Sequence, residues 1–417
     1  MQQFVYMNNF LKLAPVLSVA LALCACGVIE ENRQNEASKW TFGKDVSLLR
    51  TYADCEVLGE NGSYIAVSPK LGGRVMVATL DGASGKSLGW YNRNLVAKKD
   101  IVETSRNIIG GLNRFSLAPE GGQYALFFGS GDLMIPEKWK APQFLGASQW
   151  DLVFADKTRI ALEKSASVKN SKGAEFNFKV ERQIVSLNKA DAEKVLSAKI
   201  PDSVDMVAFA ASDKITNTSD RQWEQETGLI AAVSQSCFNA DKSTYVFVPY
   251  KEGDVKTLGN IVRDDYFQTA DEFRLFVSPK FIRFRADAKK TVEIGVLQQR
   301  AKGIALSYNA SKRLLVVVSF SMPKSRKAYV GNTWKRSDNE FAGDVLSVYN
   351  NGPVNDTSLA AEHFYEISTN SPALGLGAKK SQINIQRVFQ FSGSEYELGK
   401  LAEAVAGISI EDLRVEM

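Results

Sequence analysis

The chain has 417 residues, of which 45% are apolar and 24% charged, and this composition excludes disordered, collagenous and low-complexity chains. The formal net charge is +4 and no basic block is present, so nothing requires a nucleic-acid partner. The single histidine, His363, excludes sites that need two imidazoles, such as His-pair zinc sites. No glycine-rich phosphate loop occurs, and we expect no cofactor.

Residues 1–25 are typical of a secretion signal. A polar start is followed by an apolar run over 13–23, which is too short to span a bilayer as a stable helix. The next residues, LCACG over 23–27, resemble the lipobox of bacterial lipoproteins, whose cysteine is acylated after the signal is removed. Cys26 fits this pattern better than Cys24, which follows a bulky leucine. The alternative is a buried apolar strand that contains two cysteines.

A polar segment follows the lipobox. Residues 26–39 are rich in Glu, Asn, Gln and Ser and predict a flexible tether, with the folded domain over 40–417. Glu30 and Glu31 resemble an export signal for the outer face of the outer membrane. The lipobox resemblance therefore implies a chain that is lipid-anchored in the outer membrane, facing the periplasm or exposed on the surface.

From residue 40 onward the pattern predicts strand after strand. Segments with β-branched and aromatic residues at a period of two lie at 63–80, 123–129, 244–250, 273–277, 281–286, 313–322 and 383–391. The one convincing helix is C-terminal, over about 394–406. This pattern predicts an all-β chain folded as a large antiparallel sandwich with a short C-terminal helix. Two smaller sandwiches are the alternative.

Two further cysteines, Cys55 and Cys237, lie in the predicted folded domain. Secretion permits a disulfide between them, but their separation in the sequence gives no information on distance. A disulfide and two separate buried thiols therefore both remain open.

Several segments together resemble an uncharacterised family of bacterial lipoproteins related to galactose mutarotase-like (aldose 1-epimerase-like) proteins. They are GGLNRFSLAPEGGQYALFF at 110–128, ETGLIAAVSQSCFN at 226–239, VPYKEG at 248–253, IVRDDYF at 261–267, GDVLSVYNNGP at 343–353 and FYEISTNSPAL at 364–374. The resemblance implies the β-supersandwich of those proteins. The same sandwich serves unrelated tasks, so the resemblance is less specific for activity.

The resemblance also identifies a candidate catalytic carboxylate. Mutarotation requires a base near the anomeric hydroxyl and an acid near the ring oxygen. In the epimerases a late-strand glutamate and a central-strand histidine take these roles, and Glu366 matches the glutamate. The histidine motif is most similar to SQSCFN at 234–239, which has no histidine. Strand alternation would send His363 and Glu366 to opposite faces, so one half of the acid–base pair is missing.

A further set of polar and aromatic residues suits the binding of a carbohydrate or polyol. These candidate ligand-binding residues are Arg74, Trp90, Asn92, Arg114, Glu120, Gln123, Trp334, Asp344 and Asn350. Asp264, Asp265 and Asp344 raise the possibility of a calcium ion, although their spacing matches no EF-hand and we expect no metal.

Each candidate also has a purely structural interpretation. Glu366 could pair with Arg387, Arg114 could form an ion pair with Glu120 that holds a loop, and the tryptophans could be core residues that stack on no sugar.

Three hypotheses of function follow. The first is a membrane-anchored lipoprotein that binds carbohydrate. The second is an enzyme of aldose 1-epimerase type that uses Glu366. The third is a structural or assembly lipoprotein. The missing histidine favours binding over catalysis but does not separate a glycan binder from a structural protein.

Overall fold

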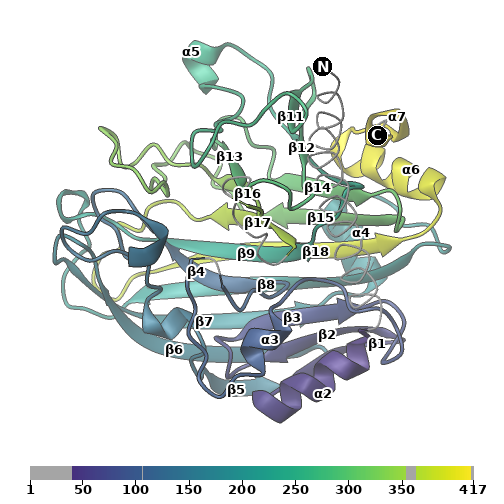
Figure 1. The fold of residues 1–417 in the computed structure, drawn as a ribbon, viewed down its shortest axis with the longest axis horizontal. Coiled ribbons are helices and arrows are strands. Elements are labelled where there is room, and N and C mark those ends of the chain that lie inside the picture. The colour runs from purple at the N-terminus through teal and green to yellow at the C-terminus, as the bar shows by residue number, and fades with distance from the viewer. Residues whose placement is uncertain (1–39, 106, 354–362, 415–417) are drawn as a thin grey trace, which may run out of the picture.

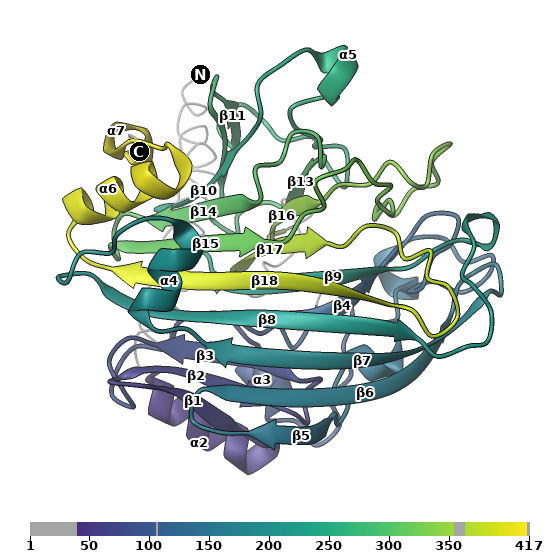
Figure 2. The same cartoon turned by 180° about the vertical axis from the view of Figure 1, so that it is seen from behind.

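The computed structural model describes residues 40–105, 107–353 and 363–414, and the predicted signal, Cys26 and the tether lie outside them. The ordered strands form three antiparallel sheets. Figures 1 and 2, which view the molecule from opposite sides, show that a long ten-stranded sheet is stacked against a layer of shorter strands. The predicted all-β antiparallel sandwich is confirmed.

The ten-stranded sheet has the order β11-β12-β10-β14-β15-β18-β8-β7-β6-β5. Its strands are β5 Asp151–Ala155, β6 Arg159–Lys169, β7 Glu175–Ser186, β8 Asp205–Asn217, β10 Thr244–Pro249, β11 Leu275–Val277, β12 Phe281–Arg285, β14 Ile304–Asn309, β15 Leu314–Phe320 and β18 Ser381–Ser392.

The second layer is built from two smaller sheets. The five-stranded sheet has the order β13-β16-β17-β9-β4, with β13 Val292–Val296, β16 Leu346–Asn350, β17 Phe364–Asn370, β9 Ala231–Asn239 and β4 Arg114–Ala118. The three-stranded sheet contains β1 Glu56–Glu60, β2 Ser63–Ser68 and β3 Arg74–Thr79. Val75 and Asn113 exchange two backbone hydrogen bonds (2.9 and 3.0 Å), which join the two sheets side by side.

The main core lies between the two layers. Strand alternation sends Tyr365 and Ile367 of β17 and Phe238 of β9 into it, where they meet apolar residues of the ten-stranded sheet such as Phe209. The other face of the five-stranded sheet is therefore turned away from this core. A second apolar cluster packs α4 and α6 against the outer face of the ten-stranded sheet.

The helices are few and mostly short. They are α2 Phe42–Tyr52, α3 Arg93–Val96, α4 Lys189–Leu196, α5 Val255–Leu258, α6 Glu395–Ala406 and α7 Ile410–Leu413. The predicted C-terminal helix is confirmed as α6, with Ser394 as its N-cap. Helix α2 corrects the expectation of strands from residue 40 onward, because Thr41 caps a helix whose buried Phe42, Val46 and Leu49 form one stripe. Of the described helices, none combines the length and the hydropathy needed to cross a bilayer.

Two further expectations are settled by the described residues. The segment 123–129 is not a strand: its backbone turns, and Leu126 and Phe127 donate to the carbonyls of Pro119 and Glu120 in a compact loop. Cys55 and Cys237 are both buried free thiols, so the disulfide alternative was wrong and the alternative of two separate thiols is confirmed.

Candidate functional site

The face of the five-stranded sheet that points away from the main core is lined with polar side chains. Cross-strand pairing places Glu366 of β17 between Cys237 of β9 and Tyr349 of β16, and Glu293 of β13 opposite Tyr349. Directly paired residues project to the same side of a sheet. We call this surface the polar face; its side chains are Arg114, Gln235, Cys237, Glu293, Ser347, Tyr349, Glu366, Ser368 and Asn370.

Glu366 is bonded to four donors on this face. Arg114 Nη2 (2.8 Å) and Cys237 Sγ (3.2 Å) approach Oε2. Gln235 Nε2 (2.8 Å) and the Ser368 hydroxyl (2.8 Å) donate to Oε1. The carboxylate is thus occupied by protein donors, and the alternative pairing with Arg387 was wrong. Glu366 acts as a fixed anchor for the side chains around it.

Arg114 is the side chain that Glu366 orients. Its Nε donates to Gln235 Oε1 (3.0 Å) while Nη2 bonds to Glu366, and within the described chain Nη1 has no protein acceptor. Burial lowers the pKa of Arg114, but the Glu366 carboxylate outweighs burial and the net pKa lies above its ordinary value. Arg114 therefore offers one free guanidinium edge at a fixed position.

Glu120 lies near this pair but does not bond to Arg114, so the predicted Arg114–Glu120 ion pair was wrong. Its Oε2 accepts from the indole nitrogens of Trp139 (3.3 Å) and Trp334 (3.2 Å). Burial raises the pKa of Glu120, against the two indole hydrogen bonds, which lower it. Trp334 is partly exposed and meets Phe267 edge-on at 5.7 Å between ring centroids.

Asp344 and Glu293 add two more buried carboxyl groups. The hydroxyl of Tyr266 donates to Asp344 Oδ2 at 2.5 Å, and Arg263 Nη2 lies 3.5 Å from the same oxygen. A Cβ built on Gly295 would lie 2.3 Å from Asp344 Oδ2, so glycine at 295 leaves the room that this carboxyl occupies. Burial raises the pKa of Asp344 and raises that of Glu293 to about 8.

The structure thus brings together five residues of the predicted set: Glu366, Arg114, Glu120, Trp334 and Asp344. The carboxyls of Glu366, Glu120 and Asp344 all interact electrostatically with Glu293. Arg114 bonds to Glu366, and Trp334 bonds to Glu120. The sequence analysis missed Glu293, Gln235, Tyr349 and Asn370. A signal for Glu293 was present, because it is the one charged residue of the otherwise apolar strand VEIGV.

Four predicted residues, Arg74, Asn92, Asn350 and Trp90, have structural surroundings instead. Arg74 is buried and bonds to the carbonyls of Gly110 (2.7 Å) and Leu145 (2.7 Å) and to Glu103 (3.2 Å). Asn92 caps α3, and Asn350 projects toward the core side, where it accepts from the backbone of Ala288 (2.9 Å).

Trp90 is buried and stacked on Phe364, with 4.1 Å between ring centroids, as the core interpretation of the tryptophans expected. Gln123 is exposed and lines a different part of the surface.

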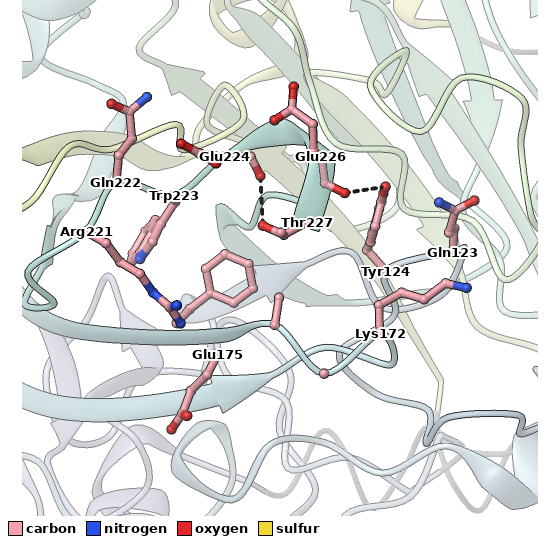
Figure 3. A pocket seen from close by; sticks show the side chains of 13 residues that line it. Gln123, Tyr124, Lys172, Glu175, Arg221, Gln222, Trp223, Glu224, Glu226 and Thr227 are labelled. Atoms are coloured by element: carbon pink, nitrogen blue, oxygen red, sulfur yellow. Dashed lines mark hydrogen bonds between the residues drawn. The ribbon is translucent and has the colours of Figure 1, made fainter.

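That part is a cavity of about 510 Å³ formed by the loops 123–124 and 221–227 and the turn between β6 and β7. Figure 3 shows its charged and polar lining, with the Tyr124 hydroxyl donating to the carbonyl of Glu226 (3.3 Å). Its lining contains none of the polar-face residues. We place the candidate site on the polar face, because oriented and desolvated charges converge there, whereas the cavity is lined by separate surface charges.

No metal centre is evident in the described part of the chain, where no group of three or more His, Cys, Asp or Glu side chains is arranged to hold an ion. Asp264 instead accepts from the backbone of Ala270 (3.2 Å), and Asp265 lies 3.3 Å from Arg263. The arrangement offers a fixed guanidinium edge, several carboxyl oxygens and an indole, which together can bind a molecule rich in hydroxyl groups.

Comparison with known proteins returned one family and a set of structures. A profile described as a family of unknown function (DUF6786) matches residues 40–417. The search of curated proteins found no match.

The solved structures that are similar to this chain include galactose mutarotase-like proteins. One is described as a candidate aldose 1-epimerase from Escherichia coli K12, with 11% identity over 81% of this chain and 98% of that chain and a TM-score of 0.47. A galactose mutarotase-like protein from Lactobacillus casei ATCC 334 has 10% identity over 81% and 99%, with a TM-score of 0.43. A galactose mutarotase related enzyme from Lactobacillus acidophilus has 10% identity over 80% and 97%, with a TM-score of 0.41. Likenesses of this size carry no argument about the chemistry of the site.

Proposed function

We propose that this chain, which belongs through residues 40–417 to the family of unknown function DUF6786, binds carbohydrate on its polar face. The observation that carries the proposal is the Arg114 guanidinium, which Glu366 and Gln235 hold with Nη1 left for a ligand. Glu120 lies within electrostatic reach of Arg114 and bonds to Trp334. A sugar would accept from the guanidinium, donate hydroxyls to the carboxyls and place its apolar face on the indole.

In this proposal Glu366 is a positioning residue. Four protein donors surround its two oxygens, so a ligand would meet Arg114 and Glu120 first. A glycan-array screen of the full chain tests the proposal. We expect binding to a restricted set of glycans that free sugar competes away. An array without any competable signal would contradict carbohydrate binding and favour a structural or assembly role.

The second candidate is an enzyme of aldose 1-epimerase type, and one observation favours it. Glu293, whose pKa is raised to about 8 by burial, could serve as the acid that the missing histidine leaves open. Against it, Glu366 has no carboxylate position left to accept a proton from a sugar hydroxyl, because Arg114, Cys237, Gln235 and Ser368 occupy both oxygens.

Polarimetry of α-glucose and α-galactose with the full chain separates the two candidates. We expect no acceleration of mutarotation above the buffer rate, because a positioned acid or base contributes roughly 10²–10⁴-fold and the base is engaged. A robust rate that Glu366→Gln abolishes would establish the enzyme instead.

The anchoring of the chain is a separate part of the proposal. We infer from the lipobox-like residues 23–27 that Cys26 carries acyl chains and that the tether over 26–39 holds the sandwich at the outer membrane. Two or more acyl chains give stable membrane attachment where a single chain does not. A sandwich anchored in this way would bind glycans close to the membrane.

A further inference from the structure

Acceptor groups outnumber cations around the polar face. The carboxyl groups of Glu120, Glu366 and Asp344 all lie within electrostatic reach of Glu293. Two guanidinium groups accompany them. Arg114 is bonded to Glu366, and Arg263 lies between Asp344 (3.5 Å) and Asp265 (3.3 Å). Glu120 and Glu293 therefore have no cation of their own within the described residues.

Two buried acceptor oxygens near these carboxyls also lack a donor. Asp344 Oδ1 and Asn370 Oδ1 have no hydrogen-bond partner, although Asp344 is 2% and Asn370 6% exposed. The two residues are in contact, because Asn370 Nδ2 donates to the backbone carbonyl of Asp344 at 2.8 Å. Asn370 projects from the same side of β17 as Glu366, and the Asp344 carboxyl covers Gly295 on that side of the sheet. Buried acceptors without donors are rare, so these two oxygens need an explanation, and a donor-rich ligand would supply one.

The protonation of Glu293, which lies within electrostatic reach of Asp344, also favours a positively charged ligand. Burial is the main cause that raises the pKa of Glu293 to about 8; the carboxyls of Glu120, Glu366 and Asp344 add to the rise, and a hydrogen bond from Ser347 opposes it. The pKa values of Tyr266 and Tyr349, which also face Glu293, are raised chiefly by burial and additionally by this carboxyl. A positive charge brought to this cluster would relieve the repulsion and favour the ionised form of Glu293.

Aromatic rings border the same cluster. The indole of Trp334 is bonded to Glu120, and Phe267 packs edge-on against both Trp334 and Tyr349, at 5.7 and 5.9 Å between ring centroids. Carboxyl groups next to aromatic rings are a favourable environment for an ammonium group.

We propose that the ligand of the polar face is a sugar that bears a protonated amine, with the ammonium directed to Glu293, Asp344 and Asn370. This inference rests on the proposed function. It goes beyond that function by selecting one chemical class: amino sugars are preferred, neutral sugars are bound more weakly and acidic sugars are excluded. Acidic sugars are excluded because an anionic group would face the desolvated carboxyls of Glu293 and Asp344.

Three β-1,4-linked tetrasaccharides that differ at a single position test the proposal. They are the glucose, N-acetylglucosamine and glucosamine tetramers, which carry a hydroxyl, an acetamide and an amine. Affinities are measured by titration calorimetry on the full chain at about pH 5.5, where the amines of the glucosamine tetramer are protonated although neighbouring oxygens lower their pKa. We expect the glucosamine tetramer to bind at least roughly tenfold more tightly than the glucose tetramer. Equal or weaker binding of the amine overturns the inference and leaves carbohydrate binding intact.

If none of the three tetramers binds, the inference is overturned, and the glycan array then decides separately whether carbohydrate binding itself survives. Replacement of Glu293 identifies the recognising residue. Glu293→Gln should reduce the amine preference to about threefold or less while affinity for the neutral tetramer stays the same. Glu175→Gln, which removes a carboxyl from the cavity whose lining contains no polar-face residue, is the matched control and should leave the preference unchanged.

A second readout reports on protonation. Because Glu293 holds its proton at about pH 7 in the free protein, binding of the ammonium should release protons, which calorimetry in two buffers of different ionisation enthalpy detects. Wild type should release protons on binding the glucosamine tetramer, and Glu293→Gln should release fewer. Equal release by both proteins would contradict the assignment of Glu293.

Discussion

Glu293 is a carboxyl group that the fold holds in its neutral form at pH 7. Burial, together with the neighbouring carboxyls of Glu120, Glu366 and Asp344, raises its pKa to about 8. In the unfolded chain the same side chain ionises near its ordinary value of about 4.3. Between these two values the folded state binds more protons than the unfolded state, so ionisation of Glu293 opposes folding as the pH rises.

This loss of stability with rising pH gives a prediction for the Glu293→Gln variant. Its free energy of unfolding relative to wild type should increase as the pH rises from about 4.5 to 8, because the variant has no proton to lose. Urea denaturation at several pH values measures the difference between the two proteins and so removes the contribution of the other titrating groups. A difference that stays constant with pH, or that shifts in favour of wild type, would contradict the buried neutral carboxyl.

The residue scale also shows why the candidate site was only partly predictable. Glu366 and Arg114 could be selected because they lie in matched family segments, and the structure pairs them at 2.8 Å. Arg74 and Asn350 were predicted ligand-binding residues too, but they bond to backbone carbonyls and amides. Residue type does not reveal whether a polar side chain binds backbone or ligand, because both need the same donors and acceptors.

At the scale of elements, a buried ion pair lies in the ten-stranded sheet on its core side. Arg182 of β7 and Asp213 of β8 are paired across the strands, 2.6 Å apart, with both side chains fully buried. Arg182 also donates to the carbonyl of Gly73 (2.8 Å) and to Asn113, which ties the second layer to the first. Removal of one partner from such a pair leaves an unpaired buried charge.

Asp213→Ala should therefore lower the free energy of unfolding by about 3–5 kcal/mol. The next residue provides a control, because Lys214 pairs with Glu181 at 2.8 Å with both side chains 42% exposed. Lys214→Ala should change stability by about 0–1 kcal/mol. Chemical denaturation of both variants measures the contrast, and similar small losses in the two would show that the buried pair is not needed for stability.

Strands were predicted correctly where the alternation of buried and exposed residues determines the secondary structure. The segments 244–250, 281–286, 313–322 and 383–391 correspond to β10, β12, β15 and β18, because alternating apolar residues suit a sheet with two packed sides. The segment 123–129 forms a loop instead, although its apolar side chains are buried. Helix α2 was missed because its stripe is short and polar residues fill the rest of the helix, although Thr41 and Asp45 are typical N-terminal residues.

At the scale of the whole molecule, we propose a carbohydrate-binding sandwich on a lipid anchor. The anchor depends on Cys26, which lies outside the described residues. Cys26→Ser should abolish acylation and leave uncleaved or mislocalised precursor, whereas Cys24→Ser should still be acylated. Detergent partitioning and metabolic labelling with a fatty acid distinguish the two variants. Loss of the lipid in the Cys24 variant with retention in the Cys26 variant would show that the cleavage site is wrong.

The central claim is that the polar face, and not the cavity at the end of the ten-stranded sheet, binds the sugar. Titration of one glycan selected by the array against wild type, Glu366→Gln and Gln222→Ala tests it. Gln222 lines the cavity and serves as the control. Trp334→Ala, which removes an indole that borders the polar face, is a second variant in case Glu366→Gln is unstable. The melting temperature of each protein verifies its fold.

We predict a loss of affinity of roughly tenfold or more in Glu366→Gln, because Arg114 loses the partner that orients it, and no change in Gln222→Ala. Trp334→Ala should weaken binding in the same direction. A folded Glu366→Gln protein that binds as wild type does, together with a loss in Gln222→Ala, would contradict the account and move the binding site to the cavity.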